Sequence, residues 1–371
     1  METFKELGVQ KDFIKALDGL SITKPTEIQK LAIPLLLNAK TDLIGQAQTG
    51  TGKTAAFGLP MLQSIDASLN QIQGLILCPT RELGQQIAKQ LFRFTKYSDQ
   101  IFTEAVYGGE KIDKQIGALR RPTHIVVATP GRLIDLLKRK ALRLDMVKNI
   151  VLDEADEMLS MGFQKELNKI LNFLPEGANK WLFSATMPHS IHEMIKVHLA
   201  SDALKIETIG KSKVNDNIQH KYFVCDEEEK LHVLVQYIKS QHKNRGIIFC
   251  RTKKVTQYLA KQLIAKNIAV DAIHGDLYQK EREKVLRAFK KETLQFIVAT
   301  DIAARGLDID ALSFVVHFQL PESEEYYTHR SGRTARAGRE GVSMAFVTAF
   351  ERKKLIEYEN SLGISFDRIR E

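Results

Sequence analysis

The sequence predicts two α/β domains in tandem, each a mostly parallel sheet flanked by helices. Two observations support this prediction: short apolar runs alternate with helix-length stretches in two successive series, and a polar segment without periodicity separates the series. The chain has 371 residues, a length that suits two domains of ordinary size. We therefore place an N-terminal domain at residues 1–207, a linker at 208–217 and a C-terminal domain at 218–371.

The first series predicts five strands in the N-terminal domain. Each is a short run of Leu, Ile, Val or aromatic residues, and the runs are Leu43–Ala47, Leu75–Cys78, Ile125–Ala128, Ile150–Leu152 and Trp181–Phe183. Helical patterns follow several of them, at Arg81–Tyr97, Arg132–Arg139 and His189–His198. Strands that alternate with helices pair in parallel, because each crossover helix returns the chain to the same edge of the sheet.

The alternation lapses at TIGKSKVNDN, which is polar and has no apolar period, and it restarts in the second half of the chain. The second series predicts strands at Tyr222–Cys225, Gly246–Phe249, Val270–His274, Phe296–Ala299, Phe314–His317 and Ser343–Val347. Helices are expected between them, including Glu227–Gln241 and Gln279–Lys290.

Composition excludes several classes of protein. Hydrophobic residues make up 44% and charged residues 27%, which excludes a disordered or fibrous chain, and the net charge of +9 is compatible with nucleic acid. No apolar run approaches the roughly 20 residues that span a bilayer, and the N-terminus lacks the apolar core of a signal peptide. The three cysteines lie far apart, and His189 and His192 have no suitable third ligand, so we expect neither disulfides nor zinc. We expect a cytoplasmic protein that does not bind membranes.

The segment AQTGTGKT, residues 47–54, follows a predicted strand and opens a helix. Gly50 and Gly52 let backbone N–H groups turn towards a phosphate, Lys53 would reach the β- and γ-phosphates, and the Thr54 hydroxyl would bind magnesium. Ala47 stands where the first glycine of this motif is usual. The alternative is a glycine-rich turn before a helix; the strand, the helix and Lys-Thr together favour a nucleotide site.

A second strand ends in the acidic run Asp153-Glu154-Ala155-Asp156. Carboxylates at the carboxyl ends of parallel strands lie where ligands bind in such sheets. Asp153 suits a magnesium–water ligand and Glu154 can polarise an attacking water. An acidic run alone is more often a solvated loop, but together with the phosphate loop it indicates hydrolysis of a phosphate anhydride.

These segments and others, in this order, resemble the DEAD-box RNA helicases of superfamily two. The shared motifs are Pro25–Gln29, the phosphate loop, Pro79–Leu83, Gly108–Gly109, Thr129–Arg132, Asp153–Asp156, Ser184–Thr186, His274–Leu277, Thr300–Asp301, Arg305–Asp308 and His329–Arg336. The resemblance extends from Phe4 to about Val347 and implies the minimal core of the family: two tandem RecA-like domains that use ATP and Mg²⁺.

The resemblance also implies residue roles at the nucleotide. It assigns nucleotide contacts to Phe4, Lys24, Thr26, Gln29, Thr49, Gly50, Thr51, Gly52, Lys53, Thr54, Asp153 and Asp308. It assigns catalysis to Lys53, Glu154, His329, Arg333 and Arg336, and Mg²⁺ to Thr54 and, through water, Asp153. The Gln29 carboxamide can donate to and accept from the adenine edge as a pair. Phe4 by itself is equally well explained as a core aromatic.

A second set of residues is implied at RNA. These are Pro79, Thr80, Arg81, Gly109, Thr129 and Arg132 in the first domain and Gly275, Gln279, Arg282 and Thr300 in the second. The resemblance also implies a coupling set, Asp156, Ser184 and Thr186, which His329 would link to the nucleotide. Ser331 and Ala335 replace the commoner Ile and Gly, and we expect little functional cost from either change.

We therefore predict a monomeric ATP-dependent RNA helicase that binds single-stranded and short duplex RNA and unwinds short duplexes by domain closure, without sequence specificity; its protein partners are unknown. Two alternatives remain open at this point. An ATP-gated RNA clamp, or a scaffold that remodels RNA–protein complexes, would carry the same motifs. A DNA helicase of the same superfamily is disfavoured by Asp156 and His329, which differ from the His and Gln expected there.

Overall fold

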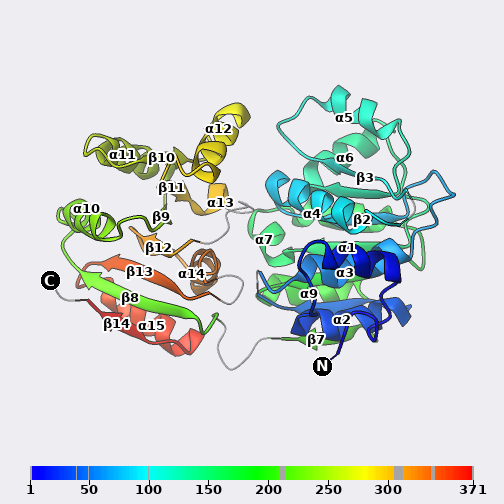
Figure 1. Ribbon diagram of the computed structural model, residues 1–371, viewed down its shortest axis with the longest axis horizontal. Coiled ribbons are helices and arrows are strands. Elements are labelled where there is room, and N and C mark those ends of the chain that lie inside the picture. The colour runs from blue at the N-terminus through cyan, green and yellow to red at the C-terminus, as the bar shows by residue number, and fades with distance from the viewer. Residues whose placement is uncertain are drawn as a thin grey trace. The chain divides into compact units, whose positions relative to one another are not determined.

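The computed structural model describes residues 2–38, 40–48, 50–98, 100–208, 214–304, 312–335 and 339–369. The chain divides into two compact units, Met1–Thr208 and Ile209–Glu371. Each unit is a seven-stranded sheet flanked by helices (Figure 1). No helix among the described residues is long and apolar enough to cross a membrane.

The sheet of unit 1 is parallel throughout and has the strand order β3-β4-β2-β5-β6-β1-β7. Its strands are β1 (Leu43–Gln46), β2 (Gly74–Leu77), β3 (Thr103–Val106), β4 (Ile125–Ala128), β5 (Asn149–Asp153), β6 (Asn179–Ser184) and β7 (Leu204–Glu207). The central strands are buried on both faces, as parallel strands covered by helices must be. Ile76 pairs with Val127 on one side and with Val151 on the other.

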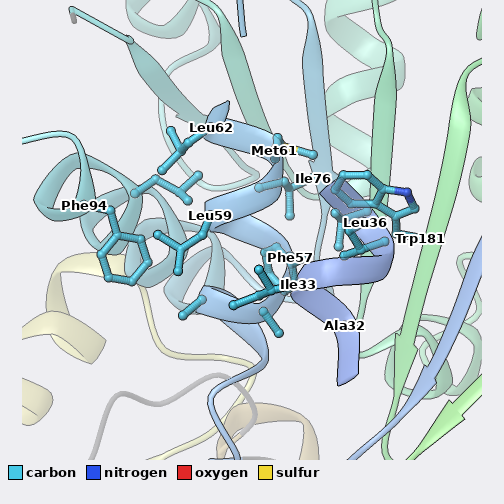
Figure 2. Packing of buried hydrophobic residues seen from close by; sticks show 14 of the residues in the cluster. Ala32, Ile33, Leu36, Phe57, Leu59, Met61, Leu62, Ile76, Phe94 and Trp181 are labelled. Atoms are coloured by element: carbon cyan, nitrogen blue, oxygen red, sulfur yellow. The ribbon is translucent and has the colours of Figure 1, made fainter. Parts of the chain in front are cut away.

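Helices cover both faces of this sheet. Helices α1 (Lys11–Asp18), α2 (Glu27–Asn38), α3 (Lys53–Gln63) and α4 (Arg81–Phe94) pack on the face that presents Ile76 and Trp181 (Figure 2). The opposite face, which presents Leu75 and Leu77, packs against α5 (Ile112–Leu119), α6 (Pro130–Lys138), α7 (Ala155–Ser160), α8 (Gln164–Asn172) and α9 (His189–His198). Alternate residues of one strand thus serve two separate cores.

Unit 2 repeats the topology of unit 1. Its order is β10-β11-β9-β12-β13-β8-β14, which becomes the order of unit 1 when seven is subtracted from each label. The strands are β8 (Ile218–Val224), β9 (Gly246–Cys250), β10 (Val270–Ile273), β11 (Phe296–Thr300), β12 (Phe314–His317), β13 (Gly341–Val347) and β14 (Phe366–Arg368). The helices are α10 (Lys230–Ser240), α11 (Lys253–Ile264), α12 (Gln279–Lys290), α13 (Asp301–Ala304), α14 (Glu324–Ser331) and α15 (Arg352–Leu362).

The predicted fold class, two tandem α/β domains with mostly parallel sheets, is confirmed. Several boundaries differ: α4 ends at Phe94 rather than Tyr97, α10 begins at Lys230 rather than Glu227, and β8 begins four residues before Tyr222. Of the predicted linker, residues 209–213 lie outside the described part of the chain. Val214 is buried against the core of unit 2, and Asn215 donates a hydrogen bond to the carbonyl of Ala335.

Candidate nucleotide and RNA sites

The phosphate loop leaves the carboxyl end of β1 and enters α3. The backbone N–H of Ala47 donates to the carbonyl of Ser184, which joins the start of the loop to the end of β6. Ala47 is fully buried in the core, which explains why a methyl group is accepted where the motif usually has glycine. The buried Lys53 donates from Nζ to the carbonyl of Ala47 at 3.1 Å, so its ammonium lies within the curve of the loop.

Gln29 holds the phosphate loop against α2. Its Nε2 donates to the carbonyl of Gly52 at 3.0 Å, and its Oε1 accepts from the backbone N–H of Thr26 at 3.0 Å. Gly52 has φ +91°, and a Cβ there would lie 2.4 Å from Gln29 Nε2, so both the backbone conformation and the close approach require glycine. Three residues of the predicted nucleotide set thereby form one hydrogen-bonded unit.

The acidic strand end of β5 lies beside this loop in the sheet order, separated from β1 only by β6. Burial raises the pKa of Asp153 to about 7, against the attraction of Lys53. Glu154, the residue before α7, lies in the left-handed region with φ 52°, and its buried Oε2 has no hydrogen-bond partner among the residues that the structure describes. A strained, buried and unpartnered carboxylate of this kind is typical of a functional site.

The oxygen donors of Asp153 and Thr54 suit a hydrated magnesium ion. Mg²⁺ is usually held by one or two carboxylates together with water and substrate phosphates, and Asp153 and Thr54 are oxygen donors of that type. No group of three or more His, Cys, Asp or Glu side chains that could hold a metal by itself exists within the described residues. The described residues therefore do not form a metal site made of such protein ligands alone.

Asp156 connects α7 to the end of β6. Its Oδ2 accepts from the Thr186 hydroxyl at 2.7 Å and from the Thr186 backbone N–H at 2.9 Å. The backbone N–H of Asp156 donates to Ser184 Oγ at 3.3 Å, and Ser184 Oγ donates to the carbonyl of Thr186 at 2.7 Å. The three predicted coupling residues of unit 1 thus form one network.

Other residues of the nucleotide set lie at different depths. Phe4 is buried in the core with Leu7 and Phe13, whereas Lys24 and Thr26 are exposed. Gly50 is exposed, and the Thr51 hydroxyl donates to the carbonyl of Gln48 at 2.8 Å. Three predicted residues, Thr49, Asp308 and Arg336, lie outside the described residues.

The predicted RNA residues of unit 1 follow β2, β4 and β3. Thr80 caps α4 by accepting from the backbone N–H of Leu83 at 3.3 Å, and Pro79 beside it is buried. The Arg81 guanidinium stacks over the Tyr107 ring at 5.0 Å. A Cβ on Gly109, which has φ +82°, would lie 3.1 Å from Arg81 Nη1, so the glycine admits the guanidinium.

Arg132 is held by α5 and by the segment that precedes it. Its Nη1 donates to Gln115 Oε1 at 2.6 Å, and its Nη2 donates to the carbonyl of Glu110 at 2.9 Å. Gln115 is buried and donates in turn to the carbonyl of Tyr107 at 3.1 Å. The sequence interpretation missed Gln115 and Tyr107. The signal was weak: one glutamine on the otherwise apolar face of a short helix, and one tyrosine before a glycine pair.

In unit 2 the predicted RNA residues gather at the carboxyl ends of the adjacent strands β10 and β11. Gly275 and Gln279 follow β10, and Thr300 ends β11. Arg282 Nη2 donates to the carbonyl of Ala303 at 2.7 Å, which joins α12 to α13. The Gln279 side chain donates to Glu283 at 2.9 Å and is partly exposed.

His329 and Arg333 lie at the end of α14, which follows β12. His329 is half-buried, and Arg333 is buried just beyond the helix. The neighbouring Arg330 is almost fully buried and forms a two-point ion pair with Asp301 of α13, at 2.5 and 2.7 Å. The sequence analysis placed Arg330 within the motif His329–Arg336 and gave it no role. Nothing in the sequence distinguished this buried arginine from Arg333 and Arg336.

The fold and the site define a class of protein: a nucleotide-binding chain of two RecA-like units, in which a phosphate loop and an acidic strand end share the carboxyl edge of one sheet. Comparison with known proteins narrows the class. Residues 26–194 match the family model described as DEAD/DEAH box helicase, and residues 229–338 match the helicase conserved C-terminal domain.

The chain is 42% identical over 369 residues to the DEAD-box ATP-dependent RNA helicase CshA of Bacillus cereus, covering all of this chain and 70% of the relative. The corresponding protein of Geobacillus kaustophilus is 41% identical over 370 residues, with 79% of its length covered. Two solved structures are similar over all of this chain. Dbp5 of S. cerevisiae bound to RNA and ADP BeF3 has TM-score 0.92, 32% identity and 96% of its chain covered; Mss116p bound to ssRNA and AMP-PNP has TM-score 0.90, 27% identity and 80% covered. This chain belongs to the DEAD-box family of RNA helicases.

Proposed function

We propose that this protein is an ATP-dependent RNA helicase, in which RNA-stimulated ATP hydrolysis drives domain closure that locally unwinds short RNA duplexes. One observation supports the proposal: in both sheets, the predicted RNA residues follow one group of neighbouring strands and the residues assigned to the nucleotide side follow others. In unit 1 the predicted RNA residues follow the neighbouring strands β3, β4 and β2, the acidic run and the phosphate loop follow β5 and β1, and the predicted coupling residues Ser184 and Thr186 lie at the end of β6 between them. In unit 2, β10 and β11 lead to the RNA residues, and β12 leads to α14 with His329 and Arg333.

At the nucleotide, Gln29 reads the adenine edge, Lys53 binds the β- and γ-phosphates, and Glu154 orients and polarises the attacking water. Glu154 Oε2 has no hydrogen-bond partner in the described part of the chain, which leaves that oxygen ready to accept from a water. Thr54 and, through water, Asp153 would hold Mg²⁺, which neutralises charge on the phosphates when bound.

Unit 2 contributes the remaining contacts to ATP. Arg333 and Arg336 act as arginine fingers on the γ-phosphate, Asp308 accepts from the ribose hydroxyls, and His329 couples the nucleotide to Asp156, Ser184 and Thr186. An arginine finger accelerates phosphoryl transfer by about 10³–10⁵. Because these contacts are divided between two units, ATP favours the conformation in which both reach it, and hydrolysis removes that preference.

At RNA, Arg81, Arg132 and Arg282 neutralise phosphates, and Gly109 and Gly275 let the strand approach the main chain. The other contacts are Pro79, Thr80, Thr129, Gln279 and Thr300. Contacts to phosphate and sugar carry no base code, so binding is independent of sequence. The ribose 2′-hydroxyl supplies the preference for RNA over DNA.

We further propose that the protein acts in the cytoplasm as a monomer. In support, Cys78, Cys225 and Cys250 are free and buried, which is compatible with a reducing compartment.

Two substitutions test the site. Lys53→Ala and Glu154→Gln abolish RNA-stimulated phosphate release, while Glu207→Gln, an exposed carboxylate at the end of the edge strand β7, leaves it unchanged. Undiminished turnover in either site variant would refute the assignment. Strand displacement of a short RNA duplex then separates the two functions: release of the strand identifies a helicase, and ATP-dependent RNA binding without release identifies a clamp.

A further inference from the structure

A buried network of hydroxyl and imidazole groups lies beneath α14. The Tyr327 hydroxyl is 2.6 Å from His220 Nδ1 and 3.0 Å from Ser343 Oγ. Ser343 Oγ is also 3.0 Å from His317 Nε2 and 3.0 Å from Ser331 Oγ. All five side chains are buried, so these hydrogen bonds are made away from water.

One assignment of protons gives each hydrogen bond of the network one donor and one acceptor, while the buried His317 Nδ1 makes no hydrogen bond within the described residues. Burial lowers the pKa of His220 to about 4 and holds that of His317 well below its usual value, so both imidazoles are neutral. If His317 donates from Nε2 and Ser331 donates from its hydroxyl, Ser343 accepts twice and donates once, to Tyr327. Tyr327 then donates to His220 Nδ1. The Ser343 hydroxyl therefore uses its one donor and two acceptor positions in full, and both imidazoles of the network stay uncharged.

The network fixes one helix to three adjacent strands. Tyr327 and Ser331 are four residues apart and therefore lie on the same face of α14. Their partners come from β12 (His317), β13 (Ser343) and β8 (His220), which are neighbours in the sheet. Two anchors one helical turn apart restrain both rotation of α14 about its axis and sliding along it.

Restraint of α14 matters because of what the helix carries. His329 lies two residues after Tyr327, roughly 200° further around the helix and so away from the network. Arg333 follows two residues after Ser331, in the turn that leaves the helix. Rotation of α14 would therefore displace both groups relative to the nucleotide.

We propose that Tyr327, Ser331 and Ser343 are positioning residues that orient His329 and Arg333 for ATP hydrolysis. The inference rests on the proposed function, because it needs Arg333 to act at the γ-phosphate. It also gives a role to Ser331, where an isoleucine is the commoner residue and where the sequence alone indicated little cost.

The effect of breaking the network is limited by a second anchor. Arg330 holds α14 independently through Asp301 and through the carbonyl of Gln319 at 2.7 Å. The helix therefore stays docked, and only its fine orientation is lost. A displacement of about 1 Å costs about 10²-fold in rate, so we expect a smaller loss, about tenfold in kcat.

The test compares two tyrosines that differ in whether they hold α14. Tyr327→Phe removes the network hydroxyl. Tyr358→Phe removes a buried hydroxyl that donates to the carbonyl of Pro321 at 2.9 Å, from a ring packed 5.5 Å from that of Tyr327. Both variants lose one buried hydroxyl from the same core, so both test stability, but only Tyr327→Phe alters the helix that carries His329.

Steady-state ATPase rates are measured with saturating single-stranded RNA, at a temperature well below the melting of every variant. We expect Tyr327→Phe to lower kcat about tenfold with KM for ATP and the RNA concentration at half stimulation within twofold of wild type, and Tyr358→Phe to keep kcat within twofold. Ser343→Ala, which removes the central hydroxyl from β13, repeats the test if Tyr327→Phe does not fold.

If the wild type is active, either of two results would overturn the inference. The first is a kcat of Tyr327→Phe, or of Ser343→Ala used in its place, that stays within twofold of wild type. The second is a loss of kcat in Tyr358→Phe equal to that in Tyr327→Phe. A wild-type chain without RNA-stimulated turnover would instead overturn the proposed function, and this inference with it. The failures of the two proposals are thus distinguishable in one experiment.

Discussion

Replacing Gln29 by glutamate changes one hydrogen-bond donor in the proposed nucleotide site into an acceptor and adds a charge. In the native chain Gln29 Nε2 donates to the carbonyl of Gly52 at 3.0 Å, and the residue is 3% exposed. In Gln29→Glu a carboxylate oxygen would face that carbonyl oxygen. The bond from the Thr26 backbone N–H to the other side-chain oxygen can remain.

The free-energy cost of Gln29→Glu is set by the protonation of the new carboxyl group. A neutral carboxylic acid can still donate to the Gly52 carbonyl, so the cost of the substitution is limited to the cost of protonating a glutamate with an ordinary pKa near 4.3. That cost is about 4 kcal/mol at pH 7.5 and about 2 kcal/mol at pH 5.5, at 1.36 kcal/mol per pH unit. Because the folded state raises the pKa of this carboxyl, the variant loses stability as the pH rises through this range.

The assay uses the single tryptophan. Trp181 is buried in the core of unit 1 beside α2, so its fluorescence reports the unfolding of that unit in urea (Figure 2). We expect Gln29→Glu to reduce the free energy of unfolding by about 4 kcal/mol at pH 7.5 and by about half as much at pH 5.5. ATP affinity should fall in parallel, because the single proton of the acid is used on the Gly52 carbonyl and none is left to donate to adenine N7.

Gln115→Glu is the matched control. Gln115 is as deeply buried, at 4% exposed, and also donates to a carbonyl, but its Oε1 already accepts from Arg132 at 2.6 Å. The new charge would be paired there, so we expect a cost of about 1 kcal/mol with little pH dependence. Equal destabilisation of the two variants, or a cost for Gln29→Glu that does not shrink at pH 5.5, would refute this account of Gln29.

Three further predictions concern other parts of the molecule. Asp156→Asn leaves a backbone N–H of Thr186 or Glu157 without its acceptor; we expect a loss of about 2 kcal/mol in urea unfolding and reduced RNA stimulation of the ATPase, and unchanged values for both would contradict the network. Burial lowers the pKa of His220 from 6.5 to about 4, so unit 2 loses stability as the pH falls below 6.5, by about 2 kcal/mol at pH 5. Hydrogen exchange in β8 should show this loss in the wild type and not in His220→Gln. Three phosphate contacts by Arg81, Arg132 and Arg282 predict a slope of about −2 for log affinity against log salt on single-stranded RNA, and Arg132→Gln should reduce its size by about 0.7; an unchanged slope would remove Arg132 from the RNA site.

The fold was predictable where burial is complete. Runs such as Leu75–Cys78 and Ile125–Ala128 are apolar throughout because helices cover both faces of the sheet, and complete burial leaves a clear signal in the sequence. Three strands of the described residues were not predicted, and each of them is an edge strand of its sheet. Thr103–Val106 and Leu204–Glu207 are half-polar, and Phe366–Arg368 has only three residues, so tertiary pairing rather than local composition makes them strands.

The candidate site was predictable only in part, for a similar reason. Motif positions indicated Gln29, Lys53 and Asp156, and the structure gives each of them hydrogen-bond partners within the site; their functional roles stay predictions. Residues that hold the motifs in place left no such signal. Gln115 meets Arg132 across 17 residues, and His220 meets Tyr327 across 107, so only folding brings them together.

The central claim is that one chain couples ATP hydrolysis to RNA. The most direct test is the steady-state ATPase rate of the full chain alone, with single-stranded RNA and with DNA of the same sequence. The account predicts a large stimulation by RNA and little by DNA. Equal rates in all three conditions would contradict it, because the residues assigned to RNA would then have no influence on the phosphate loop.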